Sequence, residues 1–332
     1  MKKILALILA LTMLFALCAC GQSAAPAAAP AEEAPAEPAA QSFSVGVCQL
    51  LQHPALDAAT KGFVDTLKAK LGDQVTVTVQ NGAGDQPSCA VIANQFVSDG
   101  VDLIMANATP ALIAAAAATN EIPILGTSIT AYGAAFELDD WDGRTTQLNI
   151  SGTSDLAPLD QQAAMVKTFC PDAKTVGILY CSGEANSKFQ VETIKPLLED
   201  LGFQVNLYSF DDSNAVAAVT ANAVGECDAL YIPTDNTAAS CAETINNIAR
   251  PAQVPIIAGE SGLCSGCGIA TLSIDYYALG CATAEMALEI LVNGKDVASL
   301  PVQYSPEFTK MFNPELCEAL NITVPEDFVP IA

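Results

Sequence analysis

The chain has 332 residues, of which 51% are hydrophobic and 15% are charged, and its formal net charge is -24. This length allows two domains of ordinary size, and the composition is that of a well-buried α/β protein. Nucleic-acid binding is excluded, because phosphate contacts need a basic surface and the chain has 13 Lys and Arg against 37 Asp and Glu.

The first 19 residues have the pattern of an export signal. Lys2 and Lys3 precede an apolar run that is too short for a stable transmembrane helix. The sequence Leu17-Cys18-Ala19-Cys20-Gly21 resembles the lipobox of bacterial lipoproteins, which implies cleavage before Cys20 and lipidation of that residue. The alternative is an ordinary signal peptide that happens to contain cysteine. We expect a lipid anchor at Cys20 on the extracytoplasmic face of the cell membrane.

Residues 20–41 then form the lipidated cysteine and a tether. The segment consists almost entirely of Ala, Pro, Glu, Gln and Ser. Such a composition cannot bury enough apolar surface to fold, and its prolines keep the chain extended.

The remainder of the chain contains an internal repeat with an offset of about 130 residues. Val45-Gly46-Val47 recurs as Val176-Gly177-Ile178, and Ile122-Pro123-Ile124-Leu125 recurs as Val254-Pro255-Ile256-Ile257. Each half alternates short apolar runs with helical patterns, which predicts a parallel sheet covered by helices on both faces. The predicted fold is therefore α/β, with two similar doubly wound lobes joined by a hinge.

The predicted elements follow the same order in both halves. Strands are expected at 43–49, 75–80, 101–106, 122–126, 175–181, 204–210, 228–232 and 254–258. Helices are expected at 55–71, 88–99, 110–119, 185–201, 213–224, 238–250, 276–292 and 314–320. Hinge crossings are expected near 151–155, 272–275 and 297–304. The first lobe would comprise 43–153 with 276–297, and the second 154–275 with 298–332.

In a two-lobed α/β protein the ligand is expected between the carboxyl ends of the two sets of strands. The repeat places polar residues of the two halves at corresponding strand ends. His53 corresponds to Glu184, Thr109 to Asp235, and Ser128 to Glu260.

Hydroxyl and amide groups cluster where a strand of the second half leads into a helix. Ser182, Asn186 and Ser187 are residue types that cap helices, and the free N–H groups at a helix start attract anions. A ligand carboxylate would suit this position. Plain helix capping is the alternative.

For Thr109, a role as N-cap with Pro110 at the first helical position is a sufficient structural explanation.

Three acidic residues are candidates for a ligand ammonium group. Asp235 stands at a helix start, where it would neutralise an ammonium or merely cap the helix. Glu260 follows a strand in a Gly/Ser loop, which capping explains less well. Asp275 lies at an expected hinge crossing and would touch the ligand or cap the next helix. Together these groups suit a zwitterion, although sugars could use the same groups.

Several stretches together resemble ABC-transporter substrate-binding lipoproteins of the tryptophan/tyrosine type. These are Gln49 to Phe63, Gly84-Asp85-Gln86, Ala108-Thr109-Pro110, Glu184-Ala185-Asn186-Ser187, Pro233-Thr234-Asp235-Asn236-Thr237 and Ile274-Asp275-Tyr276-Tyr277. The resemblance spans about 43 to 305. It implies a type I periplasmic-binding fold and a hydrophobic, often aromatic, amino acid as ligand. At matching motif positions it implies ligand contacts at Thr109, Ser182, Asn186, Ser187 and Asp235.

The set of candidate ligand-binding residues also includes Gln49, at the end of the first predicted strand.

The sequence departs from the family after Ser128-Ile129-Thr130. An Asp-Pro turn and a Gly-rich stretch are usual there, and this chain has Ala131-Tyr132-Gly133. The departure affects the rim of the first lobe.

Catalysis is disfavoured, because His53 is the only histidine and the chain has no Gly-x-Ser-x-Gly motif or phosphate-binding loop. Cys264-Ser265-Gly266-Cys267 has redox or zinc spacing, but a loop disulfide or idle thiols explain it better. We expect mostly reduced thiols in the folded region. An acidic loop with Asp139, Asp140 and Asp142 would attract calcium, but a solvated loop explains it better.

The expected function is that of a monomeric binding protein that delivers a small amino acid-like ligand to an ABC permease, with no cofactor, no metal and no nucleic acid. A nucleoside- or sugar-binding lipoprotein is one alternative. The other is a sensor that passes its ligand signal to a membrane receptor.

Overall fold

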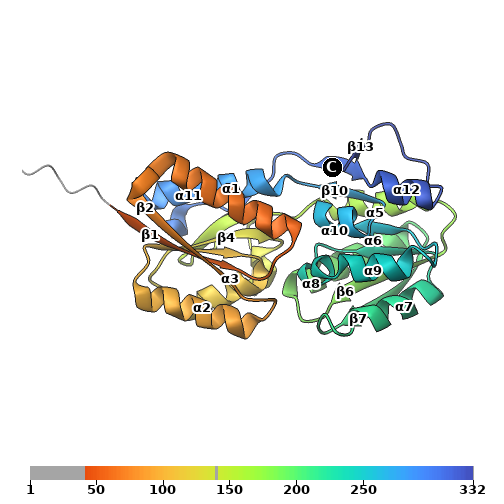
Figure 1. The fold of residues 1–332 in the computed structure, drawn as a ribbon, viewed down its shortest axis with the longest axis horizontal. Helices are drawn as coiled ribbons and strands as arrows, with labels where there is room; N and C mark the ends of the chain where they lie inside the picture. Colours follow the sequence, from red (N-terminus) through yellow and green to blue (C-terminus); the bar gives the residue numbers. More distant parts are fainter. Residues whose placement is uncertain (1–41, 139–140, 332) are drawn as a thin grey trace, which may run out of the picture. The chain divides into compact units, whose positions relative to one another are not determined.

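A computed structural model of the protein describes residues 42–138 and 141–331. The predicted signal, the lipidation site Cys20, the tether, and Asp139 and Asp140 lie outside these residues. The described chain forms two β-sheets flanked by helices (Figure 1). None of its helices has both the length and the apolar character that crossing a membrane requires.

The first sheet has the strand order β11-β5-β4-β3-β1-β2, and every pair of neighbours is parallel. Its strands are β1 (Phe43–Gln49), β2 (Val75–Asn81), β3 (Leu103–Asn107), β4 (Ile124–Ile129), β5 (Ile150–Ser154) and β11 (Gln303–Tyr304). The central strands are buried on both faces, as their continuous apolar runs predicted.

Helices cover both faces of this sheet (Figure 1). On one face α1 (Pro54–Leu71) and α11 (Tyr276–Leu291) pack on the apolar side chains of β1 and β3. On the other face lie α2 (Gln86–Asp99) and α3 (Thr109–Ala118). A one-turn helix, α4 (Tyr132–Ala135), follows β4, and two short 3-10 helices, Gly72–Gln74 and Val297–Ser299, complete the lobe.

The second sheet has the order β13-β12-β10-β9-β8-β6-β7. Its strands are β6 (Thr175–Cys181), β7 (Gln204–Phe210), β8 (Ala229–Ile232), β9 (Ile256–Ala258), β10 (Ala270–Ser273), β12 (Thr309–Phe312) and β13 (Val329–Pro330). Only the pair of β10 and β12 is antiparallel among those described. The fold class predicted from the repeat, two parallel-sheet lobes, is therefore confirmed.

Two groups of helices cover the second sheet. One core contains side chains of α5 (Leu159–Phe169), α6 (Ala185–Asp200) and α12 (Pro314–Ala319). The other contains side chains of α7 (Val216–Glu226), α8 (Asn236–Ser240), α9 (Ala242–Ala249) and α10 (Ser261–Gly266). The single helix expected at 238–250 is two helices, α8 and α9, which meet at Cys241.

The chain crosses between the lobes after β5, before α11, and between β11 and β12. The regions expected as the first two crossings, 151–155 and 272–275, overlap β5 and β10. These are the last strands of the two repeats, and neither was predicted as a strand. The third crossing falls later than the expected 297–304, because β11 pairs with β5. Residues 298–304, assigned to the second lobe from the sequence, thus contribute to the first.

Candidate functional site

The carboxyl ends of the two sheets contact each other. The side chain of His53, which precedes α1 of the first lobe, lies 3.3 Å from the Asn236 Oδ1 at the start of α8 in the second lobe. Burial lowers the pKa of His53, which favours the neutral imidazole. In a parallel sheet all strands end at the same edge. The polar residues predicted from the sequence follow strands of both sheets, so they lie where these two edges face each other.

Glu184 organises the second-lobe side of this edge. One of its carboxylate oxygens accepts from the backbone N–H and side-chain amide of Asn236 at 3.1 and 2.6 Å, and from Asn186 Nδ2 at 3.0 Å. The other accepts from the backbone N–H and hydroxyl of Thr237 at 2.8 and 2.7 Å. Five donors therefore satisfy Glu184, and its observed role is to hold the first turn of α8.

Asp235 is held in the same way. It accepts from Cys181 N at 2.6 Å, from Ser187 Oγ at 2.7 Å and, as the N-cap of α8, from Ala238 N at 2.8 Å. Burial, with the nearby charge of Glu184, raises its pKa to about 7. The carboxylate and the Ser187 hydroxyl are thus accounted for by protein contacts.

Two further predicted residues also have protein partners. Ser182 lies on the rim and donates to Asp211 Oδ1 at 2.6 Å. Gln49, buried at the end of β1, donates to Leu51 O and Asp57 Oδ1 at 2.8 and 2.6 Å and accepts from Thr60 Oγ1 at 2.6 Å. These contacts shape the first-lobe turn that carries His53.

Four other predicted residues carry buried polar atoms without a partner in the described protein. These atoms are His53 Nδ1, Thr109 Oγ1, Ser128 Oγ and Asn186 Oδ1. Each residue is at most 7% exposed. Buried polar groups are normally hydrogen-bonded, and several unpaired ones at the carboxyl ends of two facing sheets indicate a site for a polar ligand.

The start of α3 explains why Thr109 is free. An N-cap role was the structural alternative for Thr109, but the cap is Ala108, with a φ of 87°, and Thr109 is the first helical residue. Its hydroxyl makes no capping hydrogen bond. Ser128, at the end of β4, also has a left-handed φ of 56°. Strained backbone at both positions is typical of functional sites.

Glu260 and Asp275 are both helix N-caps. Contrary to our expectation, capping explains Glu260 well: its carboxylate accepts from Gly262 N and Leu263 N at the start of α10. Burial raises its pKa to about 7. Asp275 is exposed and caps α11 through Ala278 N at 3.0 Å.

Asp155 is a site residue that the sequence analysis did not name. It follows β5 at the first crossing, is 4% exposed, and accepts from Thr130 Oγ1 at 3.2 Å and Tyr276 Oη at 3.0 Å. The second of these bonds links the first crossing to the second. Burial raises the pKa of Asp155 to about 6. The available signal was an acidic residue at the expected crossing 151–155.

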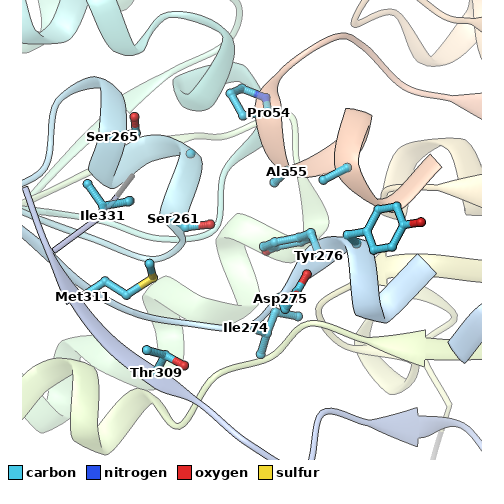
Figure 2. A pocket seen from close by; sticks show the side chains of 13 residues that line it. Pro54, Ala55, Ser261, Ser265, Ile274, Asp275, Tyr276, Thr309, Met311 and Ile331 are labelled. Atoms are coloured by element: carbon cyan, nitrogen blue, oxygen red, sulfur yellow. The ribbon is translucent and has the colours of Figure 1, made fainter. Parts of the chain in front are cut away.

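Two clefts open beside this region. Figure 2 shows the first, of about 480 Å³, which Pro54 and Ala55 of α1, Ser261 of α10 and Tyr276 of α11 line from both lobes. The second, of about 550 Å³, includes Leu50, Asp85, Glu184 and Asp211. Both clefts have walls from both lobes.

The ten cysteines from Cys48 to Cys317 are free thiols in the described structure. Cys264 on α10 and Cys267, the C-cap of that helix, are both buried. Within residues 42–138 and 141–331, no group of three or more His, Cys, Asp or Glu side chains could hold a metal ion.

The sequence profile of the ABC transporter substrate binding protein family matches residues 44–332. A tyrosine-binding protein of Clostridioides difficile (strain R20291) is 36% identical over 285 residues, which cover 84% of this chain and 81% of that protein.

Two solved structures are similarly related. The ABC domain from Streptococcus pneumoniae in complex with L-Trp is 34% identical, with a TM-score of 0.81, and the match covers 86% of this chain and 97% of that one. The ligand-free, open structure of a substrate-binding protein with adhesive properties from Clostridium difficile is 37% identical, with a TM-score of 0.65 and coverage of 87% and 100%. By TM-score, the present structure is more similar to the ligand-bound protein than to the open one. The contact between His53 of the first lobe and Asn236 of the second lobe agrees with this.

Proposed function

Because the chain belongs to the ABC transporter substrate-binding protein family, whose members bind a solute and are not enzymes, we propose that its solute is an aromatic amino acid held between the two lobes. The observation that carries this proposal is the set of unpaired buried polar atoms on His53, Thr109, Ser128 and Asn186. A bound ligand would provide hydrogen-bond partners for these atoms. Support for an aromatic amino acid comes from the ligands named for the two relatives.

We assign the ligand's ammonium group to the side of the site that holds Asp155 and Glu260. Both carboxyl groups are buried. Burial, together with the charge of Asp155, raises the pKa of Glu260 and of Tyr276. Neither acid belongs to any of the six described ion pairs. A buried carboxylate is costly unless a cation or hydrogen bonds compensate it, and an ammonium group would serve. Asp235, our assignment from the sequence, already has three donors.

The proposed role is delivery to an ABC permease from the extracytoplasmic face. In this proposal the protein acts as a monomer, anchored through Cys20 and the tether of residues 22–41. Ligand that contacts both lobes would favour the closed arrangement over the open one, and the permease would recognise the closed form.

A thermal-shift screen of the purified protein against amino acids, nucleosides and sugars tests the ligand class. A ligand that binds only the folded protein raises the unfolding temperature by mass action. We expect tyrosine or tryptophan to give the largest shift. A response to sugars or nucleosides without one to amino acids would refute the proposal.

Thr109→Ala tests the site itself. The hydroxyl has no protein partner, so its loss should leave the unfolding temperature of the free protein unchanged or higher, while affinity falls by about tenfold, or ~1.4 kcal/mol. The matched control is Thr220→Ala in α7, whose hydroxyl donates to Val216 O at 2.7 Å. The control should lose stability and keep its affinity by isothermal titration calorimetry.

A further inference from the structure

Cys48 and Cys89 are the two cysteines whose contact the binding function does not explain. Cys48 lies in β1, immediately before Gln49, and Cys89 lies in the first turn of α2. Both are completely buried. Cys48 Sγ lies 4.0 Å from the carbonyl oxygen of Cys89, and the neighbouring Cys89 side chain, with burial, raises the pKa of the Cys48 thiol.

The backbone around this pair is already tied together. Gly82 N donates to Gln49 O and Gly84 N donates to Leu50 O, both at 2.8 Å, so the turn before α2 is joined to the end of β1. Cys89 N donates to Asp85 O at 3.1 Å. A Cβ on Gly82 would overlap Cys89 Sγ, so this turn packs directly on the sulfur. The two cysteines are therefore held close together before any bond forms.

The other close cysteines differ. Cys264 Sγ lies 3.6 Å from Gly268 O, and Cys317 Sγ lies 3.4 Å from Ile269 O. Each of these thiols thus has a backbone carbonyl as its partner. Cys267 is the C-cap of the short helix α10 that contains Cys264, and no described hydrogen bond joins two of these three cysteines.

We propose that Cys48 and Cys89 form a redox-responsive disulfide when the protein meets a small-molecule disulfide, a setting that rests on the extracytoplasmic location proposed above. The thiolate of one cysteine attacks a sulfur of the oxidant and releases one small thiol. The thiolate of the other attacks the resulting mixed disulfide and releases the second. One protein S–S bond replaces two S–H bonds, and the oxidant takes up two electrons and two protons.

Access to the buried sulfurs requires local opening of the turn before α2. Residues Ala83 to Asp85 of this turn are exposed, and Ala83 and Gly84 have positive φ values of 54° and 82°. Exposed turns of this kind open at low free-energy cost compared with a core strand. The reaction should therefore proceed in the folded protein, without global unfolding.

The disulfide would fix one rim of the site. Leu50, Asp85 and Gln86, which line the larger cleft, lie next to the two cysteines along the chain, and the β1 end leads to His53. The bond joins residues 41 positions apart, and a cross-link over such a loop stabilises the fold mainly by restricting the unfolded chain. The oxidised protein should unfold at a higher temperature.

The test is incubation of the reduced, folded, full-length protein with oxidised glutathione, followed by alkylation of free thiols and peptide mapping by mass spectrometry. Lys61, Lys68 and Lys70 separate the two cysteines, so trypsin releases them on different peptides. We expect one cross-linked product that joins these peptides, and a rise of several degrees in the unfolding temperature.

Cys48→Ser and Cys89→Ser should each abolish the cross-link and the temperature rise, and Cys317→Ser should retain both. Cys89→Ala replaces the serine variant if that variant does not fold. Absence of the cross-link in folded protein, or its formation only in urea, would overturn the proposal. Ligand binding by the reduced protein is measured on the same preparation, so a failure of the proposed function is scored separately.

Discussion

Buried carboxyl groups dominate the site at the scale of single residues. Asp155, Asp235 and Glu260 are each at most 4% exposed, and hydroxyl or backbone N–H groups hold them. Burial disfavours the charged form of an acid, and hydrogen bonds from neutral groups offset only part of this effect. The free protein therefore carries acids that would be more stable protonated or beside a cation.

This arrangement predicts a pH dependence of stability. The pKa of Asp155 is raised from 3.8 to about 6, and those of Asp235 and Glu260 to about 7. A carboxyl with a raised pKa in the folded state stabilises that state fully below about pH 4, and this stabilisation is lost as the pH rises through 6 to 7. These three groups should thus lower the free energy of unfolding at about pH 8 relative to about pH 5.

Asp155→Asn removes one of these ionisations. In urea unfolding, the difference in stability between the two pH values should change by roughly 1 to 3 kcal/mol relative to the parent, because the amide stays neutral. Asp275→Asn, an exposed change at the neighbouring crossing, should behave as the parent. An unchanged pH dependence in Asp155→Asn would show that Asp155 is not the buried acid described here.

At the scale of elements, two features explain the first lobe. The departure from the family at Ala131-Tyr132-Gly133 is accommodated in the core: Tyr132 is 1% exposed, and its hydroxyl lies 3.1 Å from Gly126 O and 3.2 Å from Thr153 O. A Cβ on Gly126 or Gly152 would approach this hydroxyl too closely. The unusual tyrosine therefore fills space beneath β4 and β5.

The second feature is the close approach of α1 and α11. A Cβ on Gly280 would overlap the backbone of Ala59, and one on Gly62 would overlap the carbonyl of Tyr277. Because α11 begins at a hinge crossing, this packing anchors the crossing to the first lobe. The small residues in both helices let the two backbones meet.

Gly280→Ala should therefore destabilise the protein by about 1 to 3 kcal/mol, because the new methyl group forces the helices apart. Gly225→Ala in α7 is the matched control. Its Cβ would meet no atom within 4 Å, so it should be neutral or stabilising by up to ~1 kcal/mol. Chemical denaturation of both variants measures the difference. Equal stability of the two variants would contradict the close approach.

At the scale of the whole molecule, excess negative charge is the leading feature. The chain has 37 acidic and 13 basic side chains, and the six described ion pairs join side chains that are all at least 36% exposed. Such pairs contribute little each, whereas repulsion among the unpaired acids acts throughout the surface.

Salt should therefore stabilise the protein. Raising sodium chloride from about 0.02 to about 0.5 M shortens the Debye length and screens repulsion between acids, so the unfolding temperature measured by calorimetry should rise. The rise should be smaller at about pH 5, where the buried acids are protonated and surface acids begin to be. A fall in unfolding temperature with salt would indicate that ion pairs outweigh repulsion.

The internal repeat in the sequence determined the two-lobed α/β fold, because parallel strands need an apolar run and a crossover helix that recur in order. It also placed His53, Thr109, Ser128 and Asn186 at the carboxyl ends of strands. Only the tertiary structure decided which polar atoms are free. From the sequence, Glu184 and Asp235 were as well suited to a ligand as those four residues. In the structure, donors that are close in space but distant in sequence already satisfy both carboxylates. A sequence pattern does not reveal hydrogen bonds between residues about 50 positions apart. Asp155 and the contact between Cys48 and Cys89 came from the structure for the same reason: burial and proximity depend on how the elements pack.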